Sequence, residues 1–355
     1  MKFTKHIQAN CIILAALFCC ATQAVESDPD LAHLEQIKNK DQVDVAIDKA
    51  LAWLVTKQDV THGNFEGRYK NTETALACIA LMAAGHFPDR SKYGKHLKKG
   101  IMYLVKASSA PKHYGYLGAD GGRMYGHGIC TLALAEAYGM LDEVEDNIKI
   151  KDALEAALQV TLKSQSKAKN THFGGWRYNP NSKDADLSVS VWQVLSLRSA
   201  KNCGIRVPQQ AIDDAISYIR KCYNKKQGGY AYQPNKRPNS AMKCAGIVSL
   251  LAMGSEKNEQ DMEKIKESAK ILKTLRPNKG SHFYYNSYYF ATAANMLGPK
   301  YRKVFLPKME KALLRLQKTN GEFKKHSGHL PGVYATSFAI ICLAVKYQFL
   351  PIYQE

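Results

Sequence analysis

Two kinds of hydrophobic segment alternate along the chain. In the first kind, apolar residues recur at helical spacing and leave one polar face, as in residues 47–54, 97–104 and 212–219, with weaker copies that start near Leu154, Ile265 and Leu306. In the second kind, almost every position is apolar or small. The segments of this kind are residues 76–84, 129–135, 189–197, 245–253, 288–294 and 338–345. A helix with one polar stripe lies at a surface, whereas a helix that is apolar all round is buried on both sides.

This alternation predicts an all-α fold of six helix pairs, each with an outer helix followed by an inner one. A closed ring, the (α/α)6 toroid, satisfies both patterns at once and makes the second helix of every pair line the ring. An open solenoid is the alternative, but its end helices need polar caps, and the first and last pairs show none. We therefore expect Cys78, Cys130, Trp192, Cys244 and Cys342 to be buried. Trp53 should pack between the two layers.

A glycine and an aromatic residue separate the outer from the inner segment of most pairs. The clearest examples are Gly63…Phe65, Gly174…Trp176, Gly228…Tyr230 and Gly321…Phe323. A glycine ends a helix and permits a tight turn, and the ring that follows packs over the neighbouring helix end. Gln58, Gln165 and Gln317 stand near the ends of their outer segments, where we expect each amide to bond free carbonyls and tie one turn to the next.

The pattern of Gln58, Gly63 and Phe65, echoed by Gln317, Gly321 and Phe323, resembles the glutamine/aromatic repeat of squalene–hopene cyclases and of the wider prenyltransferase and squalene-oxidase-repeat group. The resemblance covers residues 45–350, which we take as one toroid domain after a lead-in of residues 25–44. It implies the (α/α)6 toroid. This fold serves cyclases, transferases and binding proteins alike, so it leaves the activity open. The chain looks most like short, exported, single-toroid bacterial members.

Asp184 and Asp186 follow the third glycine/aromatic turn and precede an apolar inner segment. This order is similar to that of the cyclases, where a DxDD motif supplies the acid that protonates an alkene. Carried over, Asp186 is the proton donor and Asp184 its partner, but Leu187 stands where the last carboxylate would be. The alternative is that these residues cap the inner helix, because aspartate is a preferred N-cap. We favour the cap.

Tyrosines and basic side chains gather at the starts of the predicted inner helices. If these ends meet at one mouth of the ring, they form an aromatic and cationic cup that binds a lipid, a glycan or a peptide. The alternative is that the rings only pack the turns. The predicted ligand-binding residues are Tyr125, His127, Trp176, Arg177, Tyr178, Tyr230, Tyr232, Tyr284 and Tyr288.

Lysine and arginine number 50 against 31 acidic residues, which gives a net charge of +19. The excess favours anionic partners or surfaces, but it is spread along the chain and accompanies no recognised nucleic-acid module, so nucleic acid is not expected. No cysteine or histidine spacing fits a zinc site. We expect no metal, no cofactor and no essential disulfide.

The first 24 residues read as an export signal. Lys2 and Lys5 precede ten apolar residues, 11–20, and the small residues Thr22 and Ala24 suit cleavage before Val25. Ten residues are too few to span a bilayer, and no later segment is predicted to do so. We expect a periplasmic or extracellular protein. Lipoprotein cleavage at Cys19 or Cys20 is the alternative, which the bulky Phe18 disfavours.

The leading hypothesis from the sequence is an exported toroid that binds a ligand at the inner-helix mouth. The first alternative is a cyclase-like or prenyl-lipid-handling enzyme that uses Asp186 as its acid. The second is a lyase or hydrolase that acts on cell-envelope polysaccharide. The sequence pattern is compatible with an enzyme and with a binding protein.

Overall fold

The computed structural model describes residues 40–277, 281–326 and 330–353. The predicted export signal, and the lead-in up to residue 39, lie outside these residues. Contacts divide the chain into Met1–Asp41 and Gln42–Glu355, and every helix named below belongs to the second unit. Among the described residues, no helix combines the length and the apolarity that crossing a membrane requires.

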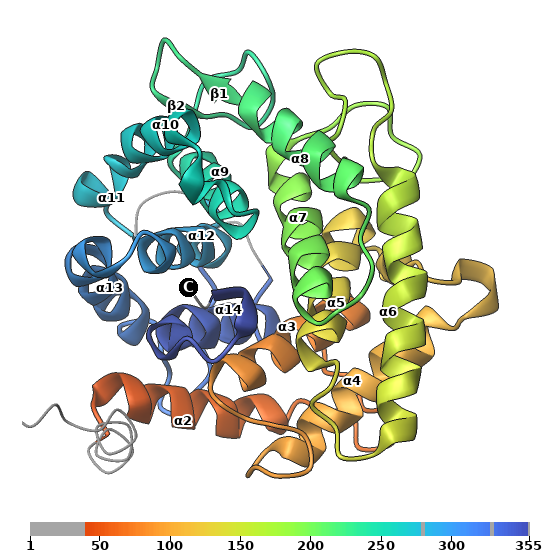
Figure 1. The fold of residues 1–355 in the computed structure, drawn as a ribbon. Coiled ribbons are helices and arrows are strands. Elements are labelled where there is room, and N and C mark those ends of the chain that lie inside the picture. The colour runs from red at the N-terminus through yellow and green to blue at the C-terminus, as the bar shows by residue number, and fades with distance from the viewer. Residues whose placement is uncertain (1–39, 278–280, 327–329, 354–355) are drawn as a thin grey trace, which may run out of the picture. The chain divides into compact units, whose positions relative to one another are not determined.

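The described helices form six outer–inner pairs (Figure 1). The outer helices are α2 (Gln42–Val55), α4 (Gly94–Ser108), α6 (Val144–Ser164), α8 (Gln209–Lys221), α10 (Glu259–Ala269) with its short continuation α11 (Ile271–Thr274), and α13 (Pro299–Leu314). The inner helices are α3 (Lys70–Ala83), α5 (Arg123–Ala137), α7 (Leu187–Asn202), α9 (Ser240–Ala252), α12 (Phe283–Met296) and α14 (Val333–Ala344). Two short strands, β1 (Tyr223–Asn224) and β2 (Gly229–Tyr230), pair antiparallel between α8 and α9.

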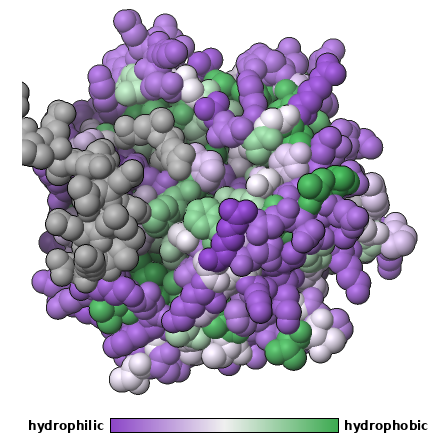
Figure 2. All heavy atoms as spheres, turned by 60° about the horizontal axis from the view of Figure 1, so that its bottom comes forward, coloured by the Kyte–Doolittle hydropathy of each residue, from purple (hydrophilic) through white to green (hydrophobic). Residues whose placement is uncertain are grey.

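The ring is closed, as predicted. Each inner helix packs against the next, and α14 packs against α3 and α2, which joins the last pair to the first (Figure 1). The inner helices are buried on almost every side, whereas an outer helix such as α8 buries one stripe that contains Ala211, Ile212, Ala215 and Ile219. Burying one isoleucine side chain contributes about 1.5–3 kcal/mol to the free energy of folding, so the interlayer stripes hold the ring together. On the face in Figure 2, hydrophilic side chains dominate and hydrophobic ones form small separate patches.

The predicted burial of individual residues is confirmed with one exception. Cys78, Cys130, Trp192, Cys244 and Cys342 are buried, and the six cysteines of the described residues are free thiols. Trp53 is the exception, because it is only half-buried on α2 with the Lys57 ammonium 5.5 Å from its ring centre. It packs against the edge of the core rather than between the two layers. Lys57, one turn further along, covers part of the ring.

The three glutamines tie the turns together as expected. Gln165 Nε2 donates to the carbonyl of Gly174 in its own turn, at 2.9 Å, and to the carbonyl of Ala211 on the next outer helix, also at 2.9 Å. Gln58 repeats both bonds with Gly63 and His96, and Gln317 repeats them with Gly321 and Ala46. Ala46 lies on α2, so the third glutamine also links the last pair to the first.

The glycine of each of these turns is required by a close backbone approach. Gly174 has φ +91°, and a Cβ there would lie 2.1 Å from the carbonyl oxygen of Asp214 on α8. Gly63 and Gly321 approach Lys99 and Lys49 of the next outer helices in the same way. Because only glycine fits these positions without strain, the repeat is a backbone device that sets each pair against its neighbour.

One end of the ring is covered by the C-terminal segment. After α14, two short 3₁₀ helices, Val345–Tyr347 and Pro351–Tyr353, pack against the inner helices. The first contacts α12 and α14, the second contacts α7 and α12, and Leu350 and Ile352 are buried. These contacts lie at the end where the inner helices finish, so the end where the inner helices begin is the place to look for a site.

Candidate functional site: a tyrosine mouth

Five tyrosines lie at the beginnings of the inner helices or in the loops before them, and all five keep part of their surface accessible. They are Tyr125 of α5, Tyr178 and Tyr232 in the loops before α7 and α9, Tyr285 of α12 and Tyr334 of α14. The rings of Tyr125 and Tyr178 have centres 5.7 Å apart, and the Tyr178 and Tyr232 hydroxyl oxygens are 2.7 Å apart. We call these five residues, together with Arg177, the tyrosine mouth.

Arg177 holds the loops of the mouth together. Its Nη1 donates to Asp186 Oδ2 at 2.7 Å and to the Tyr232 hydroxyl at 2.5 Å, and its Nε lies 3.1 Å from Asp184 Oδ2. The guanidinium also sits 4.6 Å from the centre of the Tyr178 ring. One cation is therefore matched by two carboxyl groups. The mouth is aromatic, and its arginine is paired with both carboxyl groups.

Asp186 is the N-cap of α7. Its Oδ1 accepts from the backbone N–H of Val189 at 3.0 Å and from the Ser188 hydroxyl at 2.6 Å, while Oδ2 accepts from Arg177. Burial raises the pKa of the Asp186 carboxyl, and the three donors oppose that rise. Burial by itself lowers the pKa of Arg177. The hydrogen bond and the charge of Asp186 outweigh this effect, so the pKa of Arg177 is raised.

These surroundings suit an acceptor rather than a proton donor. A carboxylic acid that protonates a substrate must direct its O–H toward that substrate. Both oxygens of Asp186 instead face donors of the protein, and the side chain has no exposed surface. The geometry matches the capping role that we favoured for Asp186, and it gives Asp184 the role of a second partner for Arg177.

The floor of the mouth is made by aromatic rings that meet across the toroid. Around the ring the inner helices run α3, α5, α7, α9, α12 and α14, so α5 and α12 are opposite each other. The centre of the Tyr125 ring on α5 nevertheless lies 6.0 Å from that of Tyr285 on α12. Side chains from opposite sides of the ring therefore touch at the level of the mouth.

A second aromatic layer lies one helical turn deeper. Trp192 of α7 stacks on Tyr288, with the ring centres 4.8 Å apart. It also meets Phe338 of α14, the helix opposite α7, with the ring centres 6.3 Å apart. Trp192, Tyr288 and Phe338 are at most 1% exposed. At this depth the centre of the ring is filled by side chains, so the mouth is shallow.

Two tyrosine hydroxyls of the mouth bond to Ser188, and that of Tyr125 is linked through the Ser188 hydroxyl to Asp186. Since Ser188 donates to Asp186, the Tyr125 hydroxyl donates to Ser188 Oγ, and the Tyr285 hydroxyl donates to the Ser188 carbonyl at 3.0 Å. Burial raises the pKa of Tyr125 and of Tyr285 well above the usual value for a phenol. Both stay neutral at physiological pH. They offer aromatic faces and hydroxyl groups, not phenolate nucleophiles.

Four predicted ligand-binding residues lie away from the mouth. His127 is fully buried between α5 and α6, where its Nδ1 accepts from the backbone N–H of Leu117 and its Nε2 lies 3.0 Å from Thr161 Oγ1. Burial lowers the pKa of His127 to about 4, so it is neutral and contributes no cation. The side chain of His127 points from α5 toward α6, so it lies outside the mouth.

The other three are buried aromatic residues that hold the turns. Trp176 donates from Nε1 to the Thr161 carbonyl at 2.8 Å, and Tyr284 donates to the Lys324 carbonyl at 2.6 Å. Tyr230 is buried in β2, with its ring 5.2 Å from that of Tyr223. In these three residues the ring packs the turn before an inner helix, which is the alternative to ligand binding given above. Tyr288 belongs to the filled centre and is not exposed at the mouth.

The site prediction missed Tyr285, Tyr334 and Glu73. Tyr285 and Tyr289 stand four residues apart, and the Tyr289 hydroxyl donates to that of Tyr285 at 2.7 Å, a spacing that marks one helix face. Glu73 lies in the first turn of α3 and is buried beneath the loop at Gly67 and Tyr69, whose N–H it accepts at 3.1 Å. Burial raises the pKa of Glu73 to about 7. No motif in the sequence marks this carboxyl group.

No group of three histidine, cysteine, aspartate or glutamate side chains in the described part of the chain is placed to hold a metal ion.

Solved structures with the same architecture belong to different functional classes. One is an inactive variant of the GH76A α-1,6-mannanase of Salegentibacter sp. HEL1_6 in complex with α-1,6-mannotetrose. It superposes with a TM-score of 0.62 at 10% sequence identity, and the match covers 86% of this chain and 98% of the mannanase chain. The type II terpene cyclase MstE from Scytonema gives a TM-score of 0.54 at 16% identity, with coverage of 87% and 99%. Candida albicans protein geranylgeranyltransferase-I complexed with GGPP gives 0.51 at 12% identity, with coverage of 85% and 90%. At these identities the likeness concerns the fold alone.

Sequence comparison assigns the family. No curated protein sequence matches the chain significantly. The family model of the prenyltransferase alpha-alpha toroid domain matches residues 14–75, 177–286 and 280–352, which together make up well over half of the chain. With the closed ring of six helix pairs, this match shows that the chain belongs to the prenyltransferase alpha-alpha toroid family.

Proposed function

We propose that this chain is a ligand-binding toroid whose tyrosine mouth holds a carbohydrate chain. The observation that carries the proposal is the aromatic floor, where Tyr125 and Tyr285 meet across the ring with their centres 6.0 Å apart. A shallow mouth with a floor of ring faces suits a ligand that lies across it. It suits less well a polyene that must be enclosed, because Trp192 and Phe338 occupy the space beneath.

The chemistry of the mouth favours a neutral, hydroxyl-rich ligand. Sugar rings present C–H faces that pack on aromatic rings, and hydroxyl groups that exchange hydrogen bonds with phenols, so an amphipathic side chain such as tyrosine matches both. Arg177 is matched by Asp184 and Asp186 and therefore offers no uncompensated charge to an anionic ligand. The mannotetrose that one of the structural relatives binds is a ligand of this kind.

Acid catalysis has less support. A cyclase-like role for Asp186 requires a free carboxylic acid, whereas its oxygens accept from Arg177, Ser188 and Val189. A polysaccharide hydrolase or lyase would use the same mouth but needs a carboxyl group that reaches the sugar. Glu73 has the suitable pKa of about 7, yet the loop at Gly67 covers it. Binding without turnover is the function that we propose.

Export is part of the same proposal, although residues 1–24, which carry the argument for it, lie outside the described residues. We expect the mature protein to begin at Val25. Mass spectrometry of the intact protein recovered from the periplasm or the medium measures this directly. A protein that keeps its first 24 residues, or that carries a lipid on Cys19 or Cys20, contradicts the predicted cleavage.

Calorimetric titration with a panel of neutral oligosaccharides of different linkage tests the binding proposal. Tyr232→Ala removes one wall of the mouth and should weaken binding by tenfold or more, since it removes both a ring face and a hydroxyl group. Tyr114→Ala is the matched control, because Tyr114 is 66% exposed and stands outside the mouth. Tight binding of geranylgeranyl diphosphate with no binding of any sugar overturns the proposal.

A further inference from the structure

The exposed positions of α13 carry positive charge and include no acidic residue. Its exposed positions follow one another at spacings of three and four residues, which places them on one stripe of the helix. They are Lys300, Lys303, Val304, Pro307, Lys308, Lys311 and the adjoining Arg315. Five of these seven side chains are cations and none is an acid. The acid of this helix, Glu310, lies at the edge of the stripe, seven residues after Lys303, and is half-buried.

Two other outer helices, α6 and α10, mix their charges. On α6 the exposed positions include Glu145, Asp152 and Glu155 beside Lys149 and Lys151, and these lysines pair with acids of the same helix. On α10, Glu259 and Glu263 are exposed as well. The outer helix α4 also exposes cations without an acid of its own, at Lys95, Lys99 and Lys106. What distinguishes α13 is that its exposed stripe holds five cations around an exposed apolar residue, Val304.

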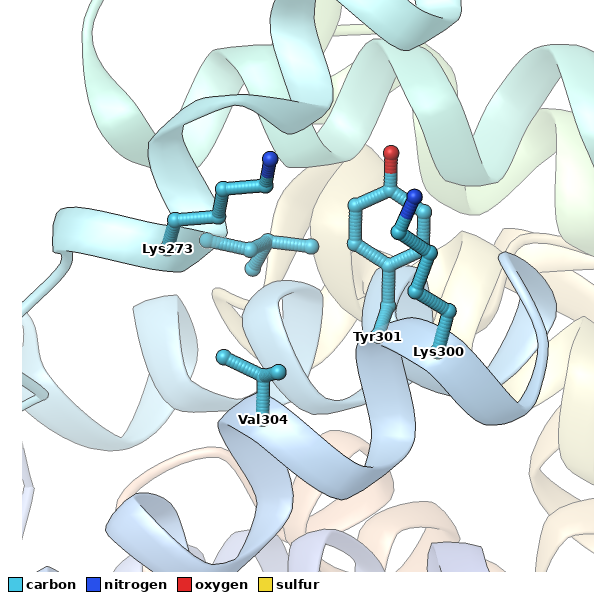
Figure 3. Close-up of a pocket in the computed structure, with 5 residues that line it drawn as sticks. Lys273, Lys300, Tyr301 and Val304 are labelled. Atoms are coloured by element: carbon cyan, nitrogen blue, oxygen red, sulfur yellow. The ribbon is translucent and has the colours of Figure 1, made fainter.

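The α13 face also has an apolar component. A small cavity of about 40 Å³ lies between α11 and α13, lined by Leu272, Tyr301 and Val304 together with Lys273 and Lys300. In Figure 3 the two lysines flank the opening, and their ammonium groups and the Tyr301 hydroxyl point to the same side. Val304 is 45% exposed. Lysines around an exposed apolar residue match the boundary between lipid headgroups and acyl chains.

We propose that this face, the exposed stripe of α13 with Lys273 of α11, binds the surface of a membrane that contains anionic lipids. α13 lies on the outside of the ring, and its 16 residues, with Pro307 among them, extend about 24 Å along a membrane plane. Its lysines then reach the phosphates while Val304 reaches the acyl boundary. The tyrosine mouth lies at the inner helices and takes no part in this contact, so the proposal stands independently of the proposed function.

Sedimentation with vesicles tests the proposal on the whole protein. The probe is phosphatidylcholine vesicles with about 30 mol% phosphatidylglycerol, compared with pure phosphatidylcholine, at low salt and at about 0.5 M salt. The triple variant Lys300→Gln, Lys303→Gln, Lys311→Gln removes three exposed cations of the stripe. Each lysine near an anionic surface contributes about fivefold, so the partition coefficient should fall roughly 100-fold.

The matched control removes three exposed lysines elsewhere on the ring, by Lys95→Gln, Lys106→Gln and Lys163→Gln on α4 and α6. It should bind within about threefold of the wild type, and both variants should melt within about 2 °C of it. An equal loss in the control assigns binding to net charge and overturns the proposal. So does a wild-type protein that fails to sediment with the anionic vesicles at low salt, or one that prefers duplex DNA to them.

Discussion

We call the connection between the outer and the inner helix of a pair a corner of the ring. The first corner (α2 to α3) and the third corner (α6 to α7) are built from the same parts, yet only the third forms a wall of the mouth. In both, a glutamine bonds the next outer helix and a buried aromatic residue follows the glycine. In both, a hydroxyl in the first turn of the inner helix accepts from the N–H of that aromatic residue. The first corner uses Thr74 and Phe65 at 2.9 Å, and the third uses Ser190 and Trp176 at 2.9 Å.

The corners differ in what lies between the aromatic residue and the inner helix. In the third corner ten residues intervene, and they carry Arg177, Tyr178, Asp184 and Asp186. In the first corner four residues intervene, and among them Glu66 pairs with Lys57 while Arg68 lies over the Tyr69 ring. The acid at the start of the inner helix is Glu73, which is buried and accepts from backbone N–H groups. The repeat therefore builds the ring, and the departures from the repeat supply the chemistry. The predictions below separate these two contributions.

The largest effect should come from the repeated turn itself. Gly174→Ala forces a Cβ to 2.1 Å from the Asp214 carbonyl at φ +91°, and it should lower the free energy of unfolding by about 3–4 kcal/mol. Gly139→Ala is the control, since its φ is +86° with open space around it, and about 1–2 kcal/mol is expected. Urea unfolding measures both. Equal losses would show that the close approach does not matter.

The cap of the third corner comes next. Asp186→Ala removes the acceptor for Val189 and leaves Arg177 without its buried partner, so a loss of about 2–3 kcal/mol is expected. Asp186→Asn keeps the cap but loses the ion pair, and about 1 kcal/mol is expected, more than capping alone implies. If Asp186→Asn keeps its stability but loses a measurable turnover, Asp186 is the acid and our assignment is wrong.

Glu73 should make stability depend on pH with a defined sign. Its pKa is about 7 in the folded protein against an ordinary 4.5, so folding favours the protonated form. The stability that this provides is complete below pH 4.5 and is lost as the pH rises to 7, on the order of 3 kcal/mol. Glu136, whose pKa burial also raises to about 7, acts in the same direction. Glu73→Gln should remove part of the decline, and melting curves at pH 5 and pH 8 that shift as in the wild type would contradict this.

The smallest effect is expected at Trp53. A fully buried tryptophan costs about 3–5 kcal/mol when truncated, but Trp53 is half-buried beside Lys57, so Trp53→Ala should cost only about 1 kcal/mol. Trp192→Ala, at 1% exposure, provides the contrast with the full loss. Similar losses for the two would place Trp53 in the core after all.

The ring was predictable because its signals are local and repeated. Segments with a polar stripe became outer helices, and segments that are apolar all round became inner ones. The cap at Asp186 was predictable for the same reason, since it stands directly before an apolar run.

The mouth was only partly predictable, because the sequence shows where an inner helix begins but not which side of its first turn faces the ring axis. Tyr284 and Tyr285 are neighbours in sequence, yet one bonds Lys324 outside the axis and the other meets Tyr125 across it. His127 and Tyr125 diverge in the same way. The pairing of Arg177 with Asp186, nine residues away, depends on a loop fold that no short pattern encodes.

A crystal structure of the protein with the oligosaccharide that calorimetry selects tests the central claim most directly. The account predicts a sugar ring stacked over Tyr178 or Tyr232, and no ligand below the Tyr125–Tyr285 floor. A ligand that enters the centre of the ring by displacing Trp192 and Phe338, or one bound at the outer helices, would contradict it.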